Sequence, residues 1–403
     1  MAAPADLQEE CVTSLTAKYD EYSAALHALY PKAEEPLKEE AVTNLEGTLS
    51  TIAGSAQGMY ENWLDARLAQ AVSEANPLQP TGRPDVDGAV QGARKGTAGA
   101  KDVVTPYGSI EEVKAAQKVW LQRLELAWLA GSEQILDWAV GLQSEEALGT
   151  LKQLSLKEEN YKAADLDELA VKVPAALAPA EKILLAGAIE ARRNFELMRT
   201  ALTQAPIDPE KPKDGTYKDL PIMGKGSVHR TLETQVKMWE RSMKDATKDA
   251  TKARKLAPSA SDQQKVITDG RAAPGMSRHG YGTEFDVGDG FKWNESKYKK
   301  EFGWLSTNAH KFGFFKPYQE GELSEEFRAE YKKPVVVPSE FWHWSDYPVS
   351  QAIWEVIHSH WNEALEGKLK DRVCTRIDEK RIEWVLDSLE MLHDGVNTRL
   401  PGE

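Results

Sequence analysis

The apolar residues of the amino-terminal region recur at alternating spacings of three and four, which restricts this region to helices with a continuous apolar seam. Two segments show this spacing, residues 12–29 and residues 42–63. Pro31 and Pro36 interrupt the pattern between them, so we expect a short connection that makes the two helices antiparallel neighbours. The seams consist of Val12, Leu15, Tyr19, Tyr22, Leu26 and Leu29, followed by Val42, Leu45, Leu49, Ile52, Ala56, Met59 and Trp63.

Further helices are expected after a long loop. Residues 76–108 contain several prolines and a run of glycines, which predicts a flexible loop. Ser109 and Glu112 have the spacing of a capping box, and the apolar pattern behind them predicts a helix that reaches Trp138. Another helix is expected at residues 180–204. Residues 1–204 are therefore predicted to form an all-α helical bundle module.

The composition changes at residues 205–226, where prolines and lysines replace the helical pattern. Such a segment is typical of a domain boundary. Beyond it, helical stretches alternate with glycine-rich segments and a short predicted strand at residues 335–337, which favours an α+β catalytic domain at residues 205–366. A helical extension is predicted for residues 367–403.

Charge and cysteine content limit the classes of function. The formal net charge is −14 and the sequence pI is about 5.2, which disfavours binding to nucleic-acid phosphates. No apolar run approaches the roughly 20 residues of a membrane span. Cys11 and Cys374 lack a metal-binding spacing, so we expect free thiols, with a disulfide between them as the alternative.

One short stretch, residues 277–287, departs from the helical composition around it, with His279 and Asp286 seven residues apart. In a continuous helix these side chains would lie about 10 Å apart along the axis, too far for one metal ion. In a regular strand, an odd separation would put them on opposite faces. Gly280 and Gly282 accept positive φ angles, so the chain can turn after His279 and enter a strand that carries Asp286.

A second pair of chemically active residues lies near position 340. Glu340 and His343 are three residues apart, and one helical turn or a bulged strand can direct both toward one point. Two histidines and a carboxylate with an open fourth position are typical of catalytic zinc, and a further carboxylate serves as the base. We therefore expect His279, Asp286 and His343 to bind Zn²⁺ and Glu340 to be the base, with an arginine to hold negative charge on the substrate.

These segments resemble a known enzyme family. The resemblance is to the zinc D-alanyl-D-alanine carboxypeptidases and the related L-Ala-D-Glu endolysin peptidases, a group that includes the vancomycin-resistance dipeptidases. The group shares its fold with lysostaphin-type enzymes and the hedgehog signalling domain. The motifs that carry the resemblance are Ser277-x-His279-x-x-Gly282-x-x-x-Asp286, Glu340-x-Trp342-His343, Arg230 with Gln235 in HRTLETQ, and RAAPGMS at residues 271–277.

The resemblance covers about residues 215–348 and implies a small antiparallel-sheet zinc peptidase domain after the helical module. It implies zinc ligands at the three positions already named, a catalytic role for Glu340 and Arg230, and substrate contacts for Ser277. Gln235 is placed with the substrate-binding residues. The family usually has alanine two residues before the metal aspartate, whereas this chain has Glu284. Because Glu284 shares a strand face with Asp286, it is predicted to lie near the ion or the substrate.

The expected function is zinc-dependent hydrolysis of peptide bonds in bacterial peptidoglycan stem peptides or their precursors, by D,D-carboxypeptidase or L-Ala-D-Glu endopeptidase activity. The first fifteen residues lack the basic and apolar regions of a secretory signal, so cytoplasmic synthesis is expected, with release or delivery to the periplasm or cell wall by a non-classical route. A lytic or delivered antibacterial enzyme fits this, and the helical module would dock to a delivery apparatus or partner protein. The alternative is a non-catalytic binding module that keeps the metal as a structural element.

Overall fold

The structure of the chain is a computed structural model. It describes residues 39–75, 105–155, 173, 175–208, 215–223, 227–246, 274–275, 277–289, 297–317, 340–360 and 363–374.

The chain divides into two compact units, residues 1–71 and residues 72–403. Helix α2, Glu39–Glu74, contains the second apolar seam and confirms the helix predicted there. Met59 and Tyr60 on this helix are exposed. The first seam at residues 12–29 and most of the predicted loop at residues 76–108 lie outside the described residues, as does Cys11.

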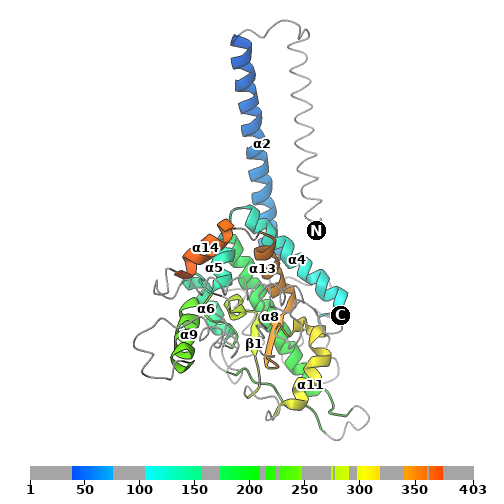
Figure 1. Cartoon of the computed structure of the whole chain (residues 1–403). Coiled ribbons are helices and arrows are strands. Elements are labelled where there is room, and N and C mark those ends of the chain that lie inside the picture. The colour runs from blue at the N-terminus through cyan, green and yellow to red at the C-terminus, as the bar shows by residue number, and fades with distance from the viewer. Residues whose placement is uncertain are drawn as a thin grey trace, which may run out of the picture. The chain divides into compact units, whose positions relative to one another are not determined.

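The second unit is mostly helical, as Figure 1 shows. Two short 3-10 helices, η3 and η5, accompany the α-helices. The bounds are α4 Ile110–Leu129, α5 Gln134–Val140, α6 Glu145–Leu154, α8 Pro179–Gln204, α9 Leu232–Ala246, η3 Arg278–Tyr281, α11 Lys299–Asn308, η5 Ala309–Phe312, α13 Tyr347–Ser359 and α14 Glu363–Cys374.

The N-cap predicted at Ser109 is present, but the glutamate of the predicted capping box bonds to the residue before the N-cap instead of to Ser109 itself. Ser109 Oγ accepts a hydrogen bond from the backbone N–H of Glu112 at 3.2 Å, and the Glu112 carboxylate accepts one from the backbone of Gly108 at 2.7 Å. The helix that begins here does not continue to Trp138, as the sequence predicted. It ends at Leu129, because Gly131 takes a φ of 75° and turns the chain before α5 begins.

Three short strands form one antiparallel sheet in the order β1, β3, β2, which confirms the predicted α+β class with a small sheet. The strands are β1 Glu284–Asp286, β2 Phe314–Phe315 and β3 His343–Asp346. Glu284 pairs with Ser345 and Asp286 pairs with His343, so these four side chains lie on one face. The strand predicted at residues 335–337 lies outside the described residues.

The opposite face of the sheet is apolar and packs against helix α8. The Phe195 ring of α8 stacks on the Phe285 ring of β1, with centroids 4.3 Å apart, and Phe314 meets Phe285 edge-on at 5.5 Å. Trp344 of β3 joins the same buried cluster. This core takes residues from both sides of position 204. The predicted division at residues 1–204, 205–366 and 367–403 stays a prediction, but the helices before position 204 help to build the surroundings of the sheet.

Helix α14 lies at the start of the predicted carboxyl-terminal extension and contacts α5. Lys368 and Arg372 form ion pairs with Glu133, with N to O distances of 2.6 and 2.7 Å, and Arg372 also pairs with Asp137 at 2.5 Å. On its inner side, Val373 is fully buried. The extension therefore begins as part of the second unit.

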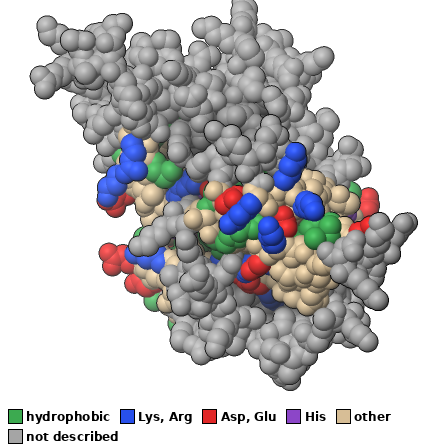
Figure 2. Space-filling view, turned by 90° about the horizontal axis from the view of Figure 1, so that it is seen from below, with side chains coloured by type: hydrophobic (Ala, Val, Ile, Leu, Met, Phe, Trp, Pro, Cys, Tyr) green, Lys and Arg blue, Asp and Glu red, His purple; other side chains and the backbone are tan. Residues whose placement is uncertain are grey.

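On the face shown in Figure 2, the coloured lysine and arginine side chains lie next to aspartate and glutamate side chains. Among the described residues, no helix combines the length and the apolar character that crossing a membrane requires.

Candidate metal centre

The register of β1 against β3 sets the position of two predicted ligands. Asp286 and His343 are direct partners across the antiparallel pair, so their side chains project from the same face. Glu340 lies just before β3, and its carbonyl oxygen accepts a hydrogen bond from the backbone N–H of His343 at 3.1 Å. A tight turn therefore places Glu340 at the beginning of β3, the middle strand of the sheet.

The third ligand, His279, lies in η3, and two glycines bring it to the sheet in different ways. Gly282 ends η3 with a φ of 77°, as predicted. The expectation of a positive φ is wrong for Gly280. A Cβ atom at Gly280 would lie 2.9 Å from the carbonyl oxygen of Ala139, so this glycine is needed because the end of helix α5 approaches the loop closely.

His279, Asp286 and His343 together form a buried cluster. One potential ligand atom from each lies within 4.8 Å of the others. His279 Nε2 is 3.3 Å from Asp286 Oδ2, and His343 Nδ1 is 3.0 Å from Asp286 Oδ1. Asp286 Oδ1 is buried and faces His343 Nδ1. Lone-pair atoms that converge in this way fit a divalent metal ion, which these three residues would hold.

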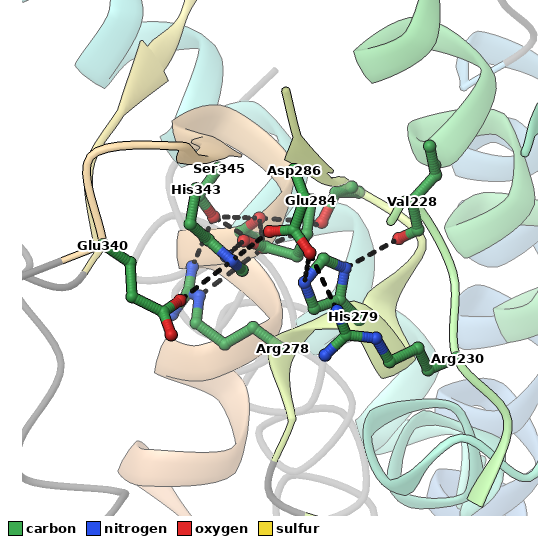
Figure 3. A network of polar contacts seen from close by, with 11 residues as sticks. Val228, Arg230, Arg278, His279, Glu284, Asp286, Glu340, His343 and Ser345 are labelled. Atoms are coloured by element: carbon green, nitrogen blue, oxygen red, sulfur yellow. Dashed lines mark hydrogen bonds and ion pairs between the residues drawn. The ribbon is translucent and has the colours of Figure 1, made fainter. Parts of the chain in front are cut away.

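The surroundings of His279 favour its neutral form. Burial and the nearby charge of Arg230 lower the pKa of His279 to about 4. Its Nδ1 lies 3.4 Å from the carbonyl oxygen of Val228, which places the ring proton on Nδ1 and leaves the Nε2 lone pair facing Asp286 (Figure 3). A neutral imidazole with this tautomer is the form that binds a metal ion.

His343 has carboxylates on both sides of its ring. Burial alone would lower the pKa of His343, but its contacts with Asp286 and Glu284 outweigh burial and raise the pKa to about 9. The Nε2 atom lies 2.7 Å from Glu284 Oε2, on the side away from Nδ1. For Glu284 itself, burial would raise the pKa, but the charge of Arg278 and the hydrogen bond with His343 lower it to about 2. Glu284 is therefore ionised.

The two residues predicted to be catalytic lie beside the cluster and are the more exposed members of the site. Glu340 Oε2 is 3.5 Å from His343 Nδ1, and its side chain is 14% exposed. Arg230 donates to Asp286 Oδ2 at 2.8 Å, and its side chain is 17% exposed. Figure 3 shows both side chains reaching the cluster from different segments.

The predicted substrate-binding residues occupy different surroundings. Ser277 is buried directly before η3, and its carbonyl accepts a hydrogen bond from Gly280 at 2.9 Å. Gln235 is buried on α9, where its amide donates to the Arg230 carbonyl at 3.2 Å and accepts from the backbone of Gly275 at 2.8 Å. Glu284 is fully buried behind His343. The substrate contacts predicted for these three residues stay predictions.

Several residues of the site were not singled out by the sequence. The Nε1–H of Trp138 in α5 donates to the Tyr281 carbonyl at 2.9 Å, and the Gln143 amide donates to the Gly280 carbonyl at 2.8 Å. Burial lowers the pKa of His229 to about 3, and this neutral ring donates to Gln143 Oε1 at 3.1 Å. The contacts of Trp138 and Gln143 join the loop that carries His279 to α5 and to the segment directly after it, more than 130 residues earlier in the chain. No local sequence pattern marks such a pairing.

Comparison with known proteins agrees with this geometry. Residues 218–348, about a third of the chain, match the model of the VanY family of D-alanyl-D-alanine carboxypeptidases. The chain contains a VanY-family domain. This family consists of zinc metallopeptidases, and the buried histidine, aspartate and histidine give the domain its candidate metal site. The resemblance found in the sequence motifs is thereby confirmed.

One solved structure is similar to part of this chain. It shows VanYB in complex with D-alanine-D-alanine, with 22% sequence identity, a TM-score of 0.23, and coverage of 40% of this chain and 74% of that chain. No curated protein matches the chain.

Proposed function

We propose that the chain is a zinc-dependent peptidase that removes the terminal D-alanine from peptidoglycan stem peptides or their precursors. The observation that carries this proposal is the buried cluster of His279, Asp286 and His343, with a glutamate at its edge, inside a VanY-family domain. The match of residues 218–348 to a D-alanyl-D-alanine carboxypeptidase family supports the choice of this bond over the L-Ala-D-Glu bond.

The exposed fractions of the side chains separate the residues proposed to bind the metal ion from those proposed to act on the substrate. The three ligand side chains are at most 7% exposed, whereas Glu340 and Arg230 reach 14% and 17%. A bound zinc ion supplies Lewis-acid chemistry, which lowers the pKa of water and polarises a carbonyl group. The cluster holds the ion, and the two more exposed side chains face water and substrate.

Glu340 is placed to move the proton. Its carboxylate takes a proton from the attacking water and passes it to the amine of the leaving D-alanine. The guanidinium of Arg230 provides positive charge for the terminal carboxylate of the peptide or for the oxyanion that develops on the scissile carbonyl. Delivery to the cell wall by a non-classical route, in a lytic or antibacterial role, remains part of this proposal.

The test is mass spectrometry of a precursor pentapeptide ending in D-Ala-D-Ala after incubation with the zinc-loaded protein. The wild type should release free D-alanine, and Glu340→Gln should lower kcat by about 10²–10⁴-fold while retaining zinc. Glu355→Gln is the matched control, because Glu355 lies on α13 and pairs with Gln117 rather than with the cluster.

Two outcomes would redirect the proposal. Cleavage between L-Ala and D-Glu in purified muropeptides, with the pentapeptide intact, would identify an endopeptidase. A zinc-loaded wild type as inactive as Glu340→Gln on both substrates would favour a binding module.

A further inference from the structure

Glu284 is the clearest departure of this chain from the family pattern, and the structure suggests a specific role for it. We propose that Glu284 is a positioning residue that fixes His343 in the tautomer with its proton on Nε2, so that Nδ1 is available to the metal ion. This inference rests on the zinc site of the proposed function, and it concerns how that site is built.

The register of the sheet places Glu284 on the far side of His343. Asp286 is opposite His343, and Glu284 lies two residues earlier on the same strand, so both carboxylates project from the same face. His343 Nδ1 lies 3.0 Å from Asp286, and its Nε2 lies 2.7 Å from Glu284. The two carboxylates therefore contact opposite edges of one imidazole ring (Figure 3).

Other side chains hold the Glu284 carboxylate in place. Oε1 accepts hydrogen bonds from Ser345 at 2.6 Å and from Ser350 at 2.9 Å. Arg278 Nε lies 3.5 Å from the same oxygen, and the other end of its guanidinium donates to Ser345 at 3.0 Å. With Oε1 held in this way, Oε2 points at His343.

The burial of Glu284 separates this role from substrate binding. Its side chain is fully buried, and Arg278 is only 3% exposed. A carboxylate can remain charged at such a position only when partners satisfy it, and the serines and the arginine do so. The only described metal-cluster residue that it contacts is His343, through the nitrogen opposite the ion-facing one.

A carboxylate in this position has a known effect on metal affinity. When the second nitrogen of a metal-binding histidine donates to a carboxylate, the ring is oriented, its tautomer is fixed and its basicity increases. Loss of such a partner typically costs 10–100-fold in metal affinity. An alanine at position 284 would leave the Nε2–H of His343 without this acceptor.

The experiment measures zinc affinity by competition with a chelator, without substrate. Glu284→Ala should weaken zinc binding by about 10–100-fold. Glu284→Gln, which keeps an oxygen acceptor but loses the charge, should recover most of this loss. The matched control is Glu301→Ala, since Glu301 is another buried glutamate that does not belong to the cluster. Its carboxylate accepts a hydrogen bond of 2.9 Å from the Lys218 backbone. This control should lower stability and leave zinc affinity unchanged.

A second measurement keeps the inference testable if Glu284→Ala fails to fold. Long-range ¹H–¹⁵N spectra of the zinc-loaded wild type, with labelled histidine, should show His343 bound through Nδ1 and carrying its proton on Nε2. Zinc binding through Nε2 would overturn the inference, as would a folded Glu284→Ala variant that binds zinc as tightly as the wild type.

The outcomes also separate this inference from the proposed function. If the variants lose zinc affinity as expected but the wild type cleaves no stem peptide, the function is wrong and the role of Glu284 stands. If the wild type releases D-alanine and Glu284→Ala keeps full zinc affinity, the function stands and the role of Glu284 is wrong.

Discussion

The two faces of β1 and β3 are both buried, but one carries polar residues of the candidate metal site and the other carries apolar residues of the core. One face presents Glu284, Asp286 and His343 to the metal cluster, while Phe285 and Trp344 on the other face pack into the apolar core with helix α8. Alternate residues of the same strands therefore form the candidate metal site and the apolar core. We therefore expect substitutions on the apolar face to change stability with little effect on zinc affinity, and substitutions on the polar face to change zinc affinity with little effect on stability.

We expect the largest effect when α8, the helix that covers the apolar face, is removed. A chain of residues 205–403 lacks α8, and with it Phe195 and Met198 from the core. Without these residues the sheet cannot bury its apolar face, so we expect no cooperative unfolding transition and no defined zinc site. Circular dichroism during urea titration would measure this. Residues 72–403, which contain the whole second unit, are the control and should unfold cooperatively. A well-folded, zinc-binding 205–403 fragment would show that the sheet does not depend on α8.

A single substitution on the apolar face should have a smaller effect. Phe195→Ala removes a fully buried ring that stacks on Phe285 and meets Phe314. We expect a loss of about 3–5 kcal/mol in the free energy of unfolding, measured by urea denaturation of the zinc-free protein. Zinc affinity should not change, because Phe195 touches the face opposite the ligands. Leu129→Ala, at an exposed position, is the control. A large fall in zinc affinity with Phe195→Ala would contradict the separation of the faces.

The smallest effect concerns Asp346, a buried carboxyl group at the end of β3. Burial raises its pKa well above the usual range and the charge of Glu190 adds to this, although the hydrogen bond from the Val349 backbone opposes the shift. Because the folded-state pKa is raised, the stability that this group contributes is present at low pH, below the unfolded pKa of about 4, and is lost as the pH rises through the folded-state pKa.

Asp346→Asn should remove this dependence while keeping the cap on α13, where Asp346 Oδ1 accepts from Val349 at 3.1 Å. The variant should match the wild type near pH 4 and exceed its stability at higher pH, by on the order of 1–2 kcal/mol. Urea denaturation across this pH range would measure the difference. Parallel pH profiles for the two proteins would show that Asp346 does not titrate in this way.

More of the candidate site than of its surroundings could be predicted from the sequence. His279, Asp286, Glu340 and His343 lie in short motifs whose spacing limits how the backbone can run, and the structure brings all four together. The role of Gly282 followed from the same argument. That of Gly280 did not, because its constraint comes from Ala139, a residue of a distant helix.

The buried partners of the predicted ligands could not be predicted from local sequence patterns, because they too come from distant segments of the chain. Arg278, Ser345 and Ser350 hold Glu284 only because strand pairing and helix α13 bring them together. The periodicity of α8 predicted a helix with an apolar side, but nothing in that pattern identified the sheet as the surface it covers. Pairing between distant segments depends on the whole fold, whereas helical spacing is local.

The close approach of α5 to the metal-binding loop bears on how the loop could be redesigned. Any side chain at position 280 would press against the carbonyl oxygen of Ala139 and the amide of Gly141. An engineer who wishes to reshape this loop for a different peptide would have to shorten or shift the end of α5 first, so the scope for new specificity is set by a helix that carries none of the proposed catalytic groups.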